Sequence, residues 1–399
     1  MGAIPFVISG EIPTFTDALF ETVSGFTTTG ASILTDVEAL SHTALLWRSL
    51  SHWIGGMGVL VFLLAILPMA GGYNMHLMRA ESPGPSVGKL VPKVRQTAII
   101  LYGIYFALTL LQFIALLIAK MPVFDAIITA VGTAGTGGFG IKSDSIGGYS
   151  PAIQWIVAVF MILFGVNFNF YFFLLGKHKN EAFKMEEVRV YLLVILAAVG
   201  IITWNIFDMT TNLEEALRYA VFQVGTVITS TGFATTDFNQ WPTLSKTILV
   251  GLMFIGACAG STGGGIKVSR FIIALKTVKQ EINSFIHPRS VKSVTLDGKP
   301  VDQQTTRSVS IYFVTFFAIY LVSLFLISFD QFDPVTNFTS IVATLNNIGP
   351  GLEVVGPAGS FHDFSAFSKF VFMFDMLAGR LELYPMLVLF APSVWKRHS

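Results

Sequence analysis

The chain has 399 residues, of which 53% are hydrophobic and 12% are charged, and its formal net charge at pH 7 is +1. Soluble domains carry roughly 25% charged residues, so this composition excludes an ordinary soluble protein and indicates a polytopic membrane protein. The single cysteine, Cys258, excludes a disulfide framework and a cysteine-based metal cluster.

Apolar segments of two lengths alternate along the chain. We predict seven membrane-spanning helices, at 47–70, 97–119, 151–175, 188–207, 242–258, 304–329 and 366–395. Shorter apolar segments occur at 14–25, 123–133, 214–227 and 334–345. They are too short to cross a bilayer, which takes about 20 residues, and we predict that they are re-entrant helices.

Each short segment runs into a turn rich in Gly, Thr or Asn. The turns are turn 1 (27–31), turn 2 (135–139), turn 3 (229–233) and turn 4 (346–350). Each contains a glycine that fits the positive φ such a turn needs, namely Gly30, Gly138, Gly232 and Gly349. Non-helical backbone at membrane depth is tolerated where it lines a water-filled cavity. Four such turns around one axis would expose backbone carbonyls as a cation filter.

Basic residues gather in alternate connections between the predicted spans. The segments 71–97, 176–189 and 267–307 and the C-terminal tail hold 18 of the 25 Lys and Arg residues, so we predict that they are cytoplasmic. The opposite connections are acidic, and all four turns lie on that outer side. We expect an acidic mouth that concentrates cations, although acidic loops that merely solvate the surface are the alternative.

The spans and turns group into four units, each made of a span, a re-entrant segment, a turn and a second span. We expect repeat 1 at 1–70, repeat 2 at 71–177, repeat 3 at 178–290 and repeat 4 at 291–399. Repeat 1 has its second span, but only a stub stands before its re-entrant segment. We therefore expect that most of the first helix of repeat 1 is missing from this chain.

Six short motifs carry a family resemblance that extends over essentially the whole chain. They are SGFTTTGA at 24–31, GGMG at 55–58, RAESPGP at 79–85, GACAGSTGGGIK at 256–267, ATLNNIGPGL at 343–352 and GRLE at 379–382. With these motifs the chain resembles the TrkH family of bacterial potassium-uptake subunits, within the wider TrkH, KtrB and plant HKT superfamily. The resemblance implies an all-α membrane protein with four pseudo-symmetric repeats around one pore.

The resemblance also implies the transported ion and the residues that bind it. K⁺ would bind at backbone carbonyls of Thr28, Thr29, Gly30, Thr136, Gly137, Gly138, Ser230, Thr231, Gly232, Asn347, Ile348 and Gly349. In HKT-like relatives a serine at the first filter glycine accompanies sodium transport, so Gly30 favours K⁺. The alternative function is a Na⁺-conducting or Na⁺/K⁺-symporting relative with the same fold.

The stretch 256–266, here called the glycine loop, interrupts the second span of repeat 3. Its five glycines, one Ser and one Thr cannot form a stable lipid-facing helix, so we predict a loop inside the pore. The resemblance implies that it is the gating loop, and the candidate gating residues are Gly260, Ser261, Thr262, Gly263, Gly264, Gly265, Lys267 and Arg380. The alternative is a glycine kink for close helix packing.

Arg380 lies about midway along the last predicted span. A charge within the membrane is costly and indicates a functional site. The resemblance places this arginine across the pore beneath the filter, where it meets the gating loop and opposes K⁺ passage. The alternative is a structural salt bridge to Asp375 or Glu382, and the two roles are compatible.

Other motifs in the chain give no support to an enzyme. Gly135, Gly137 and Gly140 match a dinucleotide-binding fingerprint, but they follow a predicted re-entrant helix rather than a strand. The glycine loop lacks the lysine spacing of a phosphate-binding loop, and the seven histidines have no metal-ligand spacing. We therefore predict a transporter that needs no organic cofactor and binds no nucleic acid.

The resemblance implies a multi-pass protein of the bacterial inner membrane, with the filter facing the periplasm and the C-terminus in the cytoplasm. It also implies a homodimer and a separate cytosolic TrkA-like subunit that binds ATP, ADP or NAD. The basic 267–307 segment is the predicted docking region for that subunit.

Overall fold

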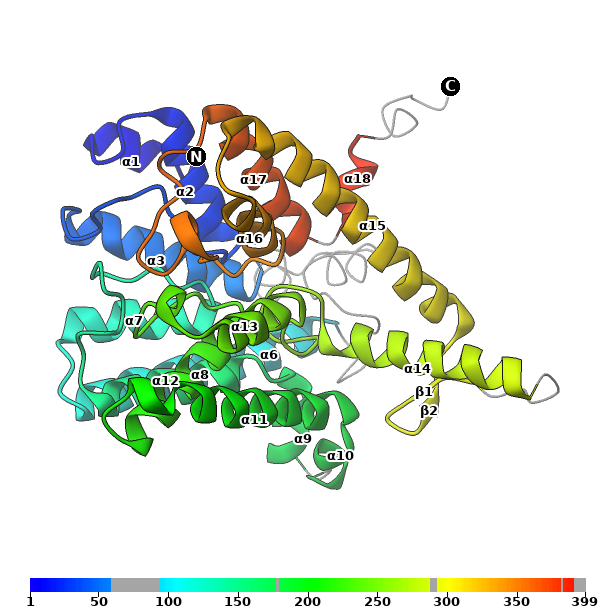
Figure 1. Cartoon of the computed structure of the whole chain (residues 1–399). Helices are drawn as coiled ribbons and strands as arrows, with labels where there is room; N and C mark the ends of the chain where they lie inside the picture. Colours follow the sequence, from blue (N-terminus) through cyan, green and yellow to red (C-terminus); the bar gives the residue numbers. More distant parts are fainter. Residues whose placement is uncertain (59–93, 177–178, 288–292, 382, 391–399) are drawn as a thin grey trace.

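The computed structural model describes residues 1–58, 94–176, 179–287, 293–381 and 383–390 (Figure 1). Within these residues the protein is helical apart from one antiparallel hairpin of β1 (Thr295–Leu296) and β2 (Lys299–Pro300). The predicted all-α class is therefore confirmed.

Three helices in the described part of the chain are long and apolar enough to cross a membrane: α6 (Val94–Ile118), α11 (Glu186–Ile206) and α15 (Gln303–Ile327). They coincide with three of the predicted spans. The predicted span 151–175 is instead a broken one, because α8 (Pro151–Phe164) and α9 (Phe168–Leu175) meet at an angle of 91°.

The remaining predicted spans are shorter in the structure. The third unit's second span ends early, with α13 (Thr243–Phe254), because the glycine loop follows at once. The last span divides into α17 (Ala366–Arg380) and α18 (Leu383–Val388), and the first is represented by α3 (His42–Gly56). Residues 59–70 and 391–395 of the predicted spans lie outside the described residues, as do most of the basic segment 71–97 and the boundaries between repeats.

The segment after the glycine loop is helical, although its charges suggested a connection. Helix α14 (Val268–Ile286) has a buried first turn and an amphipathic remainder. It extends away from the other helices beside the start of α15 (Figure 1). Its buried residues explain the difference, since Val268, Ile272 and Ile273 join the hydrophobic core.

All four predicted re-entrant segments are short helices: α2 (Phe15–Phe26), α7 (Val123–Gly135), α12 (Leu213–Ile228) and α16 (Pro334–Leu345). Side chains cap three of them, because Thr14, Asn212 and Asp333 accept hydrogen bonds from first-turn backbone N–H groups. The smaller elements are α1 (Ile4–Ser9), α10 (Lys179–Lys184) and the 3₁₀ turns η1 (Phe207–Met209), η2 (Phe238–Gln240), η3 (Ser328–Asp330) and η4 (Glu353–Val355).

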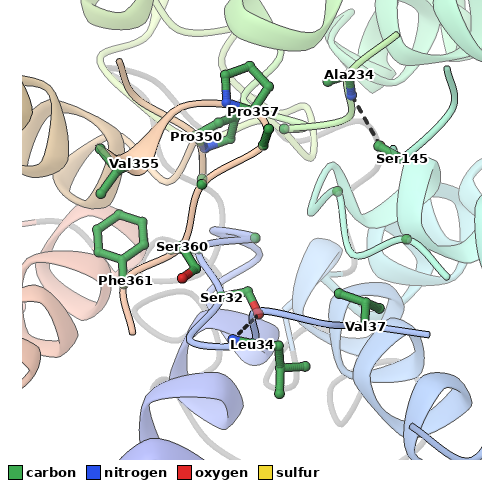
Figure 2. Close-up of a pocket in the computed structure, with 18 of the residues that line it drawn as sticks. Ser32, Leu34, Val37, Ser145, Ala234, Pro350, Val355, Pro357, Ser360 and Phe361 are labelled. Atoms are coloured by element: carbon green, nitrogen blue, oxygen red, sulfur yellow. Dashed lines mark hydrogen bonds between the residues drawn. The ribbon is translucent and has the colours of Figure 1, made fainter. Parts of the chain in front are cut away.

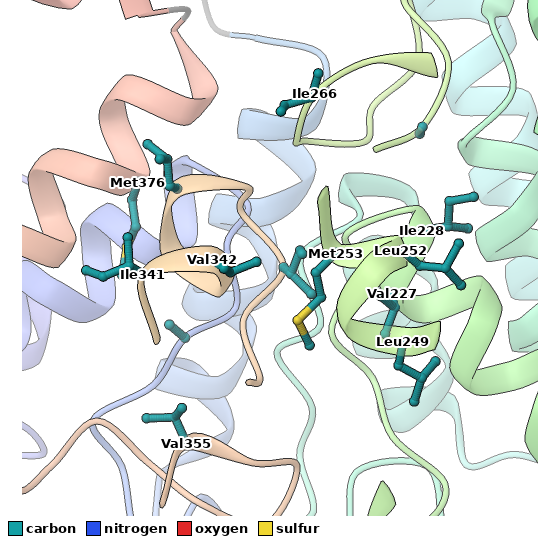
Figure 3. Packing of buried hydrophobic residues seen from close by; sticks show 14 of the residues in the cluster. Val227, Ile228, Leu249, Leu252, Met253, Ile266, Ile341, Val342, Val355 and Met376 are labelled. Atoms are coloured by element: carbon teal, nitrogen blue, oxygen red, sulfur yellow. The ribbon is translucent and has the colours of Figure 1, made fainter. Parts of the chain in front are cut away.

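The short helices pack in a cyclic order. Each one contacts the helix that follows its own turn and also a helix of the preceding unit: α2 contacts α17, α7 contacts α3, α12 contacts α8, and α16 contacts α13. Figure 3 shows one of these junctions, where Met253 of α13 points toward Val342 of α16. The short helices therefore lie inside the bundle with the four turns at their inner ends.

Candidate functional site

The four turns have the same backbone conformation. In each of them φ is positive at the glycine and also at the residue two positions earlier. The values are 55° and 78° for Thr28 and Gly30, 54° and 75° for Thr136 and Gly138, 56° and 87° for Ser230 and Gly232, and 54° and 96° for Asn347 and Gly349. Positive φ is uncommon for residues other than glycine, so its recurrence at four matched positions marks one structural device used four times.

The shared conformation arises from the way each short helix ends. In turn 1, the backbone N–H of Thr28 donates to the Gly25 carbonyl at 3.1 Å, and that of Thr29 donates to the Ser24 carbonyl at 2.9 Å. This pair of bonds is a Schellman motif, and turns 2, 3 and 4 repeat it at matched residues. The motif satisfies the last helical carbonyls and reverses the chain.

The four glycines touch carbonyls of the next turn in a closed cycle. A Cβ added to Gly30 would lie 2.0 Å from the Gly137 oxygen, and one added to Gly138 would lie 2.1 Å from the Thr231 oxygen. The cycle continues with 2.5 Å from Gly232 to the Ile348 oxygen and closes with 2.7 Å from Gly349 to the Thr29 oxygen. Each contacted carbonyl belongs to the residue before the glycine, so no larger residue fits at these positions without moving the neighbouring turn.

A cavity of about 370 Å³ lies beside this cycle, and all four turn glycines line it. Figure 2 shows residues from the segments after the turns around it, among them Ser32, Ser145, Ala234 and Pro357. The charged residues of its described lining are Arg48, Lys142 and Asp363. The expected acidic mouth is thus not found in this lining, where one carboxylate accompanies two basic side chains.

Several acidic residues of the predicted outer side instead pair with nearby basic or hydroxyl groups. Asp17 pairs with Lys369 at 2.7 Å, and Glu214 pairs with Arg218 at 3.0 Å. The Tyr149 hydroxyl donates to Asp125 at 2.7 Å, and burial together with this bond raises the pKa of Tyr149 well above its ordinary value.

A buried ion pair lies beside turn 1 and binds the residues that follow it. The Arg48 guanidinium on α3 lies 2.6 Å from the Glu21 carboxylate on α2, and both side chains are buried. Glu21 also accepts hydrogen bonds from the Ser32 hydroxyl and the Ile33 backbone, just beyond the turn. Arg48 stacks over the ring of Phe139 in turn 2, at 4.0 Å from its centroid. The pair therefore connects turns 1 and 2.

The glycine loop folds back on itself, and its tip rests against three of the turns. Its base is closed by a hydrogen bond of 2.7 Å from the Gly256 N–H to the Ile266 carbonyl. At the tip, the Thr136 hydroxyl donates to the Thr262 carbonyl at 2.9 Å, and the Gly264 N–H donates to the Ser230 hydroxyl at 2.5 Å. A Cβ on Gly264 would lie 2.7 Å from the Asn346 oxygen of turn 4.

The other predicted gating residues of the loop have local roles. The Ser261 hydroxyl donates to the Cys258 carbonyl at 2.6 Å, and Gly260 and Gly265 take positive φ of 66° and 71°. Gly263 packs on turn 3, because an added Cβ would lie 3.0 Å from the Thr229 oxygen. The close packing of this tip explains the run of glycines at 263–265.

Two cationic side chains bind carbonyls of the loop tip. Arg380 donates to the Thr262 carbonyl at 2.8 Å and to the carbonyls of Gly55 and Gly56, at the end of α3, at 2.6 and 2.7 Å. The Lys267 ammonium donates to the Gly263 carbonyl and, at 3.3 Å, to that of Gly264. Arg380 therefore meets the glycine loop, as the resemblance implied.

Asp375 and Glu382 are the alternative salt-bridge partners predicted for Arg380 from the sequence. Asp375 accepts a hydrogen bond from the Ser323 hydroxyl at 2.8 Å, and no ion pair between Asp375 and Arg380 is found among the described residues. Glu382 lies outside the described residues.

Sequence reasoning missed His52 and the side-chain contacts of the predicted filter residue Asn347, which both shape this site. His52 donates a hydrogen bond of 2.8 Å from Nδ1 to the Gly25 carbonyl, and its ring packs on Phe139. Asn347 donates to the Thr29 hydroxyl and to the Met376 carbonyl, both at 2.9 Å. Their partners lie far away in sequence, so no local signal marked them. Among the described residues no cluster of His, Cys, Asp or Glu fits a metal ion.

The helical architecture agrees with comparisons to known proteins. The family model described as TrkH, cation transport protein, matches residues 1–397. The chain belongs to the TrkH family. It is 39% identical to the Trk system potassium uptake protein TrkH of Salmonella typhimurium and 38% identical to that of Escherichia coli strain K12. Each alignment covers 99% of this chain and 83% of the relative.

A solved structure supports membership of the TrkH family at the level of the fold. The crystal structure of the potassium transporter TrkH from Vibrio parahaemolyticus superimposes with a TM-score of 0.87 at 32% sequence identity. The match covers 99% of this chain and 82% of that protein. The apolar helices of this TrkH family member are consequently those of a membrane protein.

Proposed function

We propose that this chain is a pore-forming subunit that carries K⁺ into a bacterial cell across the inner membrane. The observation that carries the proposal is the closed cycle of contacts from Gly30 through Gly138, Gly232 and Gly349 back to turn 1. A cycle of four equivalent turns is the arrangement expected of four pseudo-symmetric repeats around one axis, with the boundaries 1–70, 71–177, 178–290 and 291–399. The names of the relatives, which are potassium uptake proteins, support K⁺ as the ion.

Selection of the ion would take place at the backbone of the turns. Carbonyls of the twelve filter residues, including those of Thr29, Gly137, Thr231 and Ile348, would replace water around a dehydrated K⁺. The short helices end at the turns, and the negative ends of their dipoles would favour a cation there. Fixed contacts between neighbouring turns would hold the carbonyl ring at the size that suits K⁺ better than Na⁺.

The glycine loop would close the pathway on the inner side of the filter. It contacts turns 2, 3 and 4, and Arg380 and Lys267 bind its carbonyls with their cationic groups. A cation held beneath the filter would oppose K⁺ electrostatically while the loop is docked. K⁺ flow would require the loop and these cationic groups to move aside.

The assembly would follow from the family. We propose a homodimer with the filter facing the periplasm and the C-terminus in the cytoplasm. A cytosolic TrkA-like subunit that binds ATP, ADP or NAD would dock on the cytoplasmic face near α14, which extends away from the bundle (Figure 1).

Ion flux in liposomes tests the proposed function. Purified protein reconstituted with outward or inward K⁺ gradients should carry K⁺, with Na⁺ flux at least about tenfold smaller. Gly30→Ser should lower the preference for K⁺, because the Ser Cβ would collide with the Gly137 carbonyl and distort the ring. Equal K⁺ and Na⁺ flux through the unmodified protein would contradict selective K⁺ uptake and favour the Na⁺-conducting alternative.

A further inference from the structure

A buried glutamate at the cytoplasmic start of α11 binds the first half of the glycine loop and the helical turn that follows the loop. One carboxylate oxygen of Glu187 accepts the Ala259 backbone N–H at 2.7 Å and the Ser269 backbone N–H at 3.1 Å. Ala259 lies in the first half of the loop, and Ser269 lies just beyond its end, in the first turn of α14. The side chain is only 6% exposed, so these two bonds are made away from bulk water.

Helix α14 needs this carboxylate because it has no cap of its own. Lys267 stands at the capping position, and its side chain makes no capping hydrogen bond. The first N–H groups of a helix need partners and favour a negative charge nearby. Glu187, on another helix, supplies α14 with a hydrogen-bond acceptor and a negative charge. It thereby fixes the junction between the glycine loop and α14.

The break between α8 and α9 also holds the first half of the loop. Where the helix is interrupted, the Gly165 carbonyl accepts the Cys258 N–H at 3.0 Å, and the Phe168 N–H donates to the Gly260 carbonyl at 3.0 Å. The two residues flanking Ala259 are thus held by the break, while Ala259 itself is held by Glu187. In addition to the contacts at its tip, the first half of the loop is therefore held by backbone bonds to unit 2 and by one carboxylate of unit 3.

We propose that Glu187 is a positioning residue that keeps the glycine loop docked beneath the turns. The inference rests on the proposed function, in which the docked loop blocks K⁺. Loss of the carboxylate leaves two buried N–H groups without a partner, and it weakens the docked arrangement relative to a displaced one. The displaced loop then exposes its backbone to the cytoplasmic side and lets K⁺ pass.

The single cysteine of the chain offers a direct readout of loop position. Cys258 lies in the glycine loop, next to Ala259, and is completely buried. Its rate of modification by a small thiol-reactive methanethiosulfonate reports how often the loop leaves its docked position. The measurement needs no ion flux. It therefore distinguishes failure of the proposed role of Glu187 from failure of the proposed transport function.

The experiment compares Glu187→Ala, Glu187→Gln and the neighbouring control Glu186→Gln in full-length protein reconstituted in liposomes. Glu186 pairs with Lys276 at the surface and makes no described contact with the loop. We expect Cys258 modification at least about tenfold faster in Glu187→Ala, with raised K⁺ flux and an unchanged K⁺ to Na⁺ ratio. Glu187→Gln keeps an acceptor oxygen but loses the charge, so it should be about fivefold faster. Glu186→Gln should match the unmodified protein.

If Cys258 is modified in folded, monodisperse Glu187→Ala at the same rate as in the unsubstituted protein, the proposal is overturned. If Glu187→Ala does not fold, Glu187→Gln is used instead. A Cys258 modification rate in Glu187→Gln equal to that of the unsubstituted protein would likewise overturn the proposal. Faster modification without a change in flux would assign Glu187 to capping α14 alone and would also overturn the positioning role. Absence of K⁺ flux in the unmodified protein, with the expected order of modification rates, would count against the transport proposal instead.

Discussion

The hydroxyl of Thr136 donates a hydrogen bond of 2.9 Å to the backbone carbonyl of Thr262, which lies 126 residues further along the chain. This bond joins turn 2 directly to the tip of the glycine loop. Because Thr136 has positive φ within the turn, any movement of the loop away from this position acts on the backbone that would line the filter.

Removing this hydroxyl should favour release of the loop. A hydrogen bond of this kind contributes about 1 kcal/mol, so Thr136→Ala should shift the equilibrium between docked and released loop by about fivefold. If only a small fraction of the molecules have the loop released, we expect K⁺ flux in liposomes to rise by a similar factor. Thr136→Ser retains the hydroxyl and should behave as the unmodified protein. A rise of equal size in both variants would show that the hydrogen bond is not responsible.

Arg380 should oppose K⁺ flux through both its charge and its geometry. Arg380→Ala removes three hydrogen bonds to backbone carbonyls and the cation near the loop tip, so basal flux should rise at least about tenfold. Arg380→Lys keeps the charge but cannot reach three carbonyls as a planar fork, so its flux should be intermediate. Flux assays on the three proteins give the order. Unchanged flux in Arg380→Ala would restrict this residue to a structural role.

The cycle of turns makes a prediction about two nearby glycines that differ in their surroundings. A Cβ at Gly138 would lie 2.1 Å from the Thr231 carbonyl, whereas one at Gly140 would meet nothing closer than 3.8 Å. Gly138→Ala should therefore abolish the preference for K⁺ over Na⁺, or abolish flux, while Gly140→Ala should leave both intact. Competition of Na⁺ with K⁺ uptake measures the preference. Equal effects of the two substitutions would contradict the assignment of Gly138 to the filter.

Two ion pairs on the short helices α2 and α12 should contribute very differently to stability. Glu21→Gln leaves the buried Arg48 without its counter-charge, and we expect a loss of about 3 kcal/mol. Glu214 pairs with Arg218, but its side chain is 53% exposed, so Glu214→Gln should cost well under 1 kcal/mol. Thermal unfolding of the detergent-solubilised protein compares them. A similar melting temperature for both variants would mean that Glu21 and Arg48 are not a tight pair.

The positions of the short helices and turns could be predicted because their signals are local. Apolar segments of fixed length followed by glycine identified all four, and the glycine loop was predicted from its composition. The positive φ of Thr28, Thr136, Ser230 and Asn347 was not predicted, since Thr and Ser rarely adopt it, although Asn does so more often. It follows from the Schellman motif, in which hydrogen bonds to the preceding helix impose the conformation.

Features that depend on distant partners were beyond prediction. The stretch 151–175 was predicted as one span because most of its residues are apolar, and Gly165 and Asn167 were not recognised as a break. At this break the freed backbone groups pair with the glycine loop. The acidic outer residues suggested an electrostatic mouth, whereas Asp17 and Glu21 are engaged by Lys369 and Arg48 from other helices. Likewise, Glu187 became significant only when its position beside Ala259 was known.

The four turns differ in their contacts with the glycine loop. The glycine loop touches turns 2, 3 and 4, while the Thr28 hydroxyl of turn 1 has no hydrogen-bond partner among the described residues. An assembly of four identical subunits would bring four copies of any such loop to the same axis, where they would collide. Joining the four units in one polypeptide lets a single loop approach from one side, so the loop and the ring of turns can change independently in evolution.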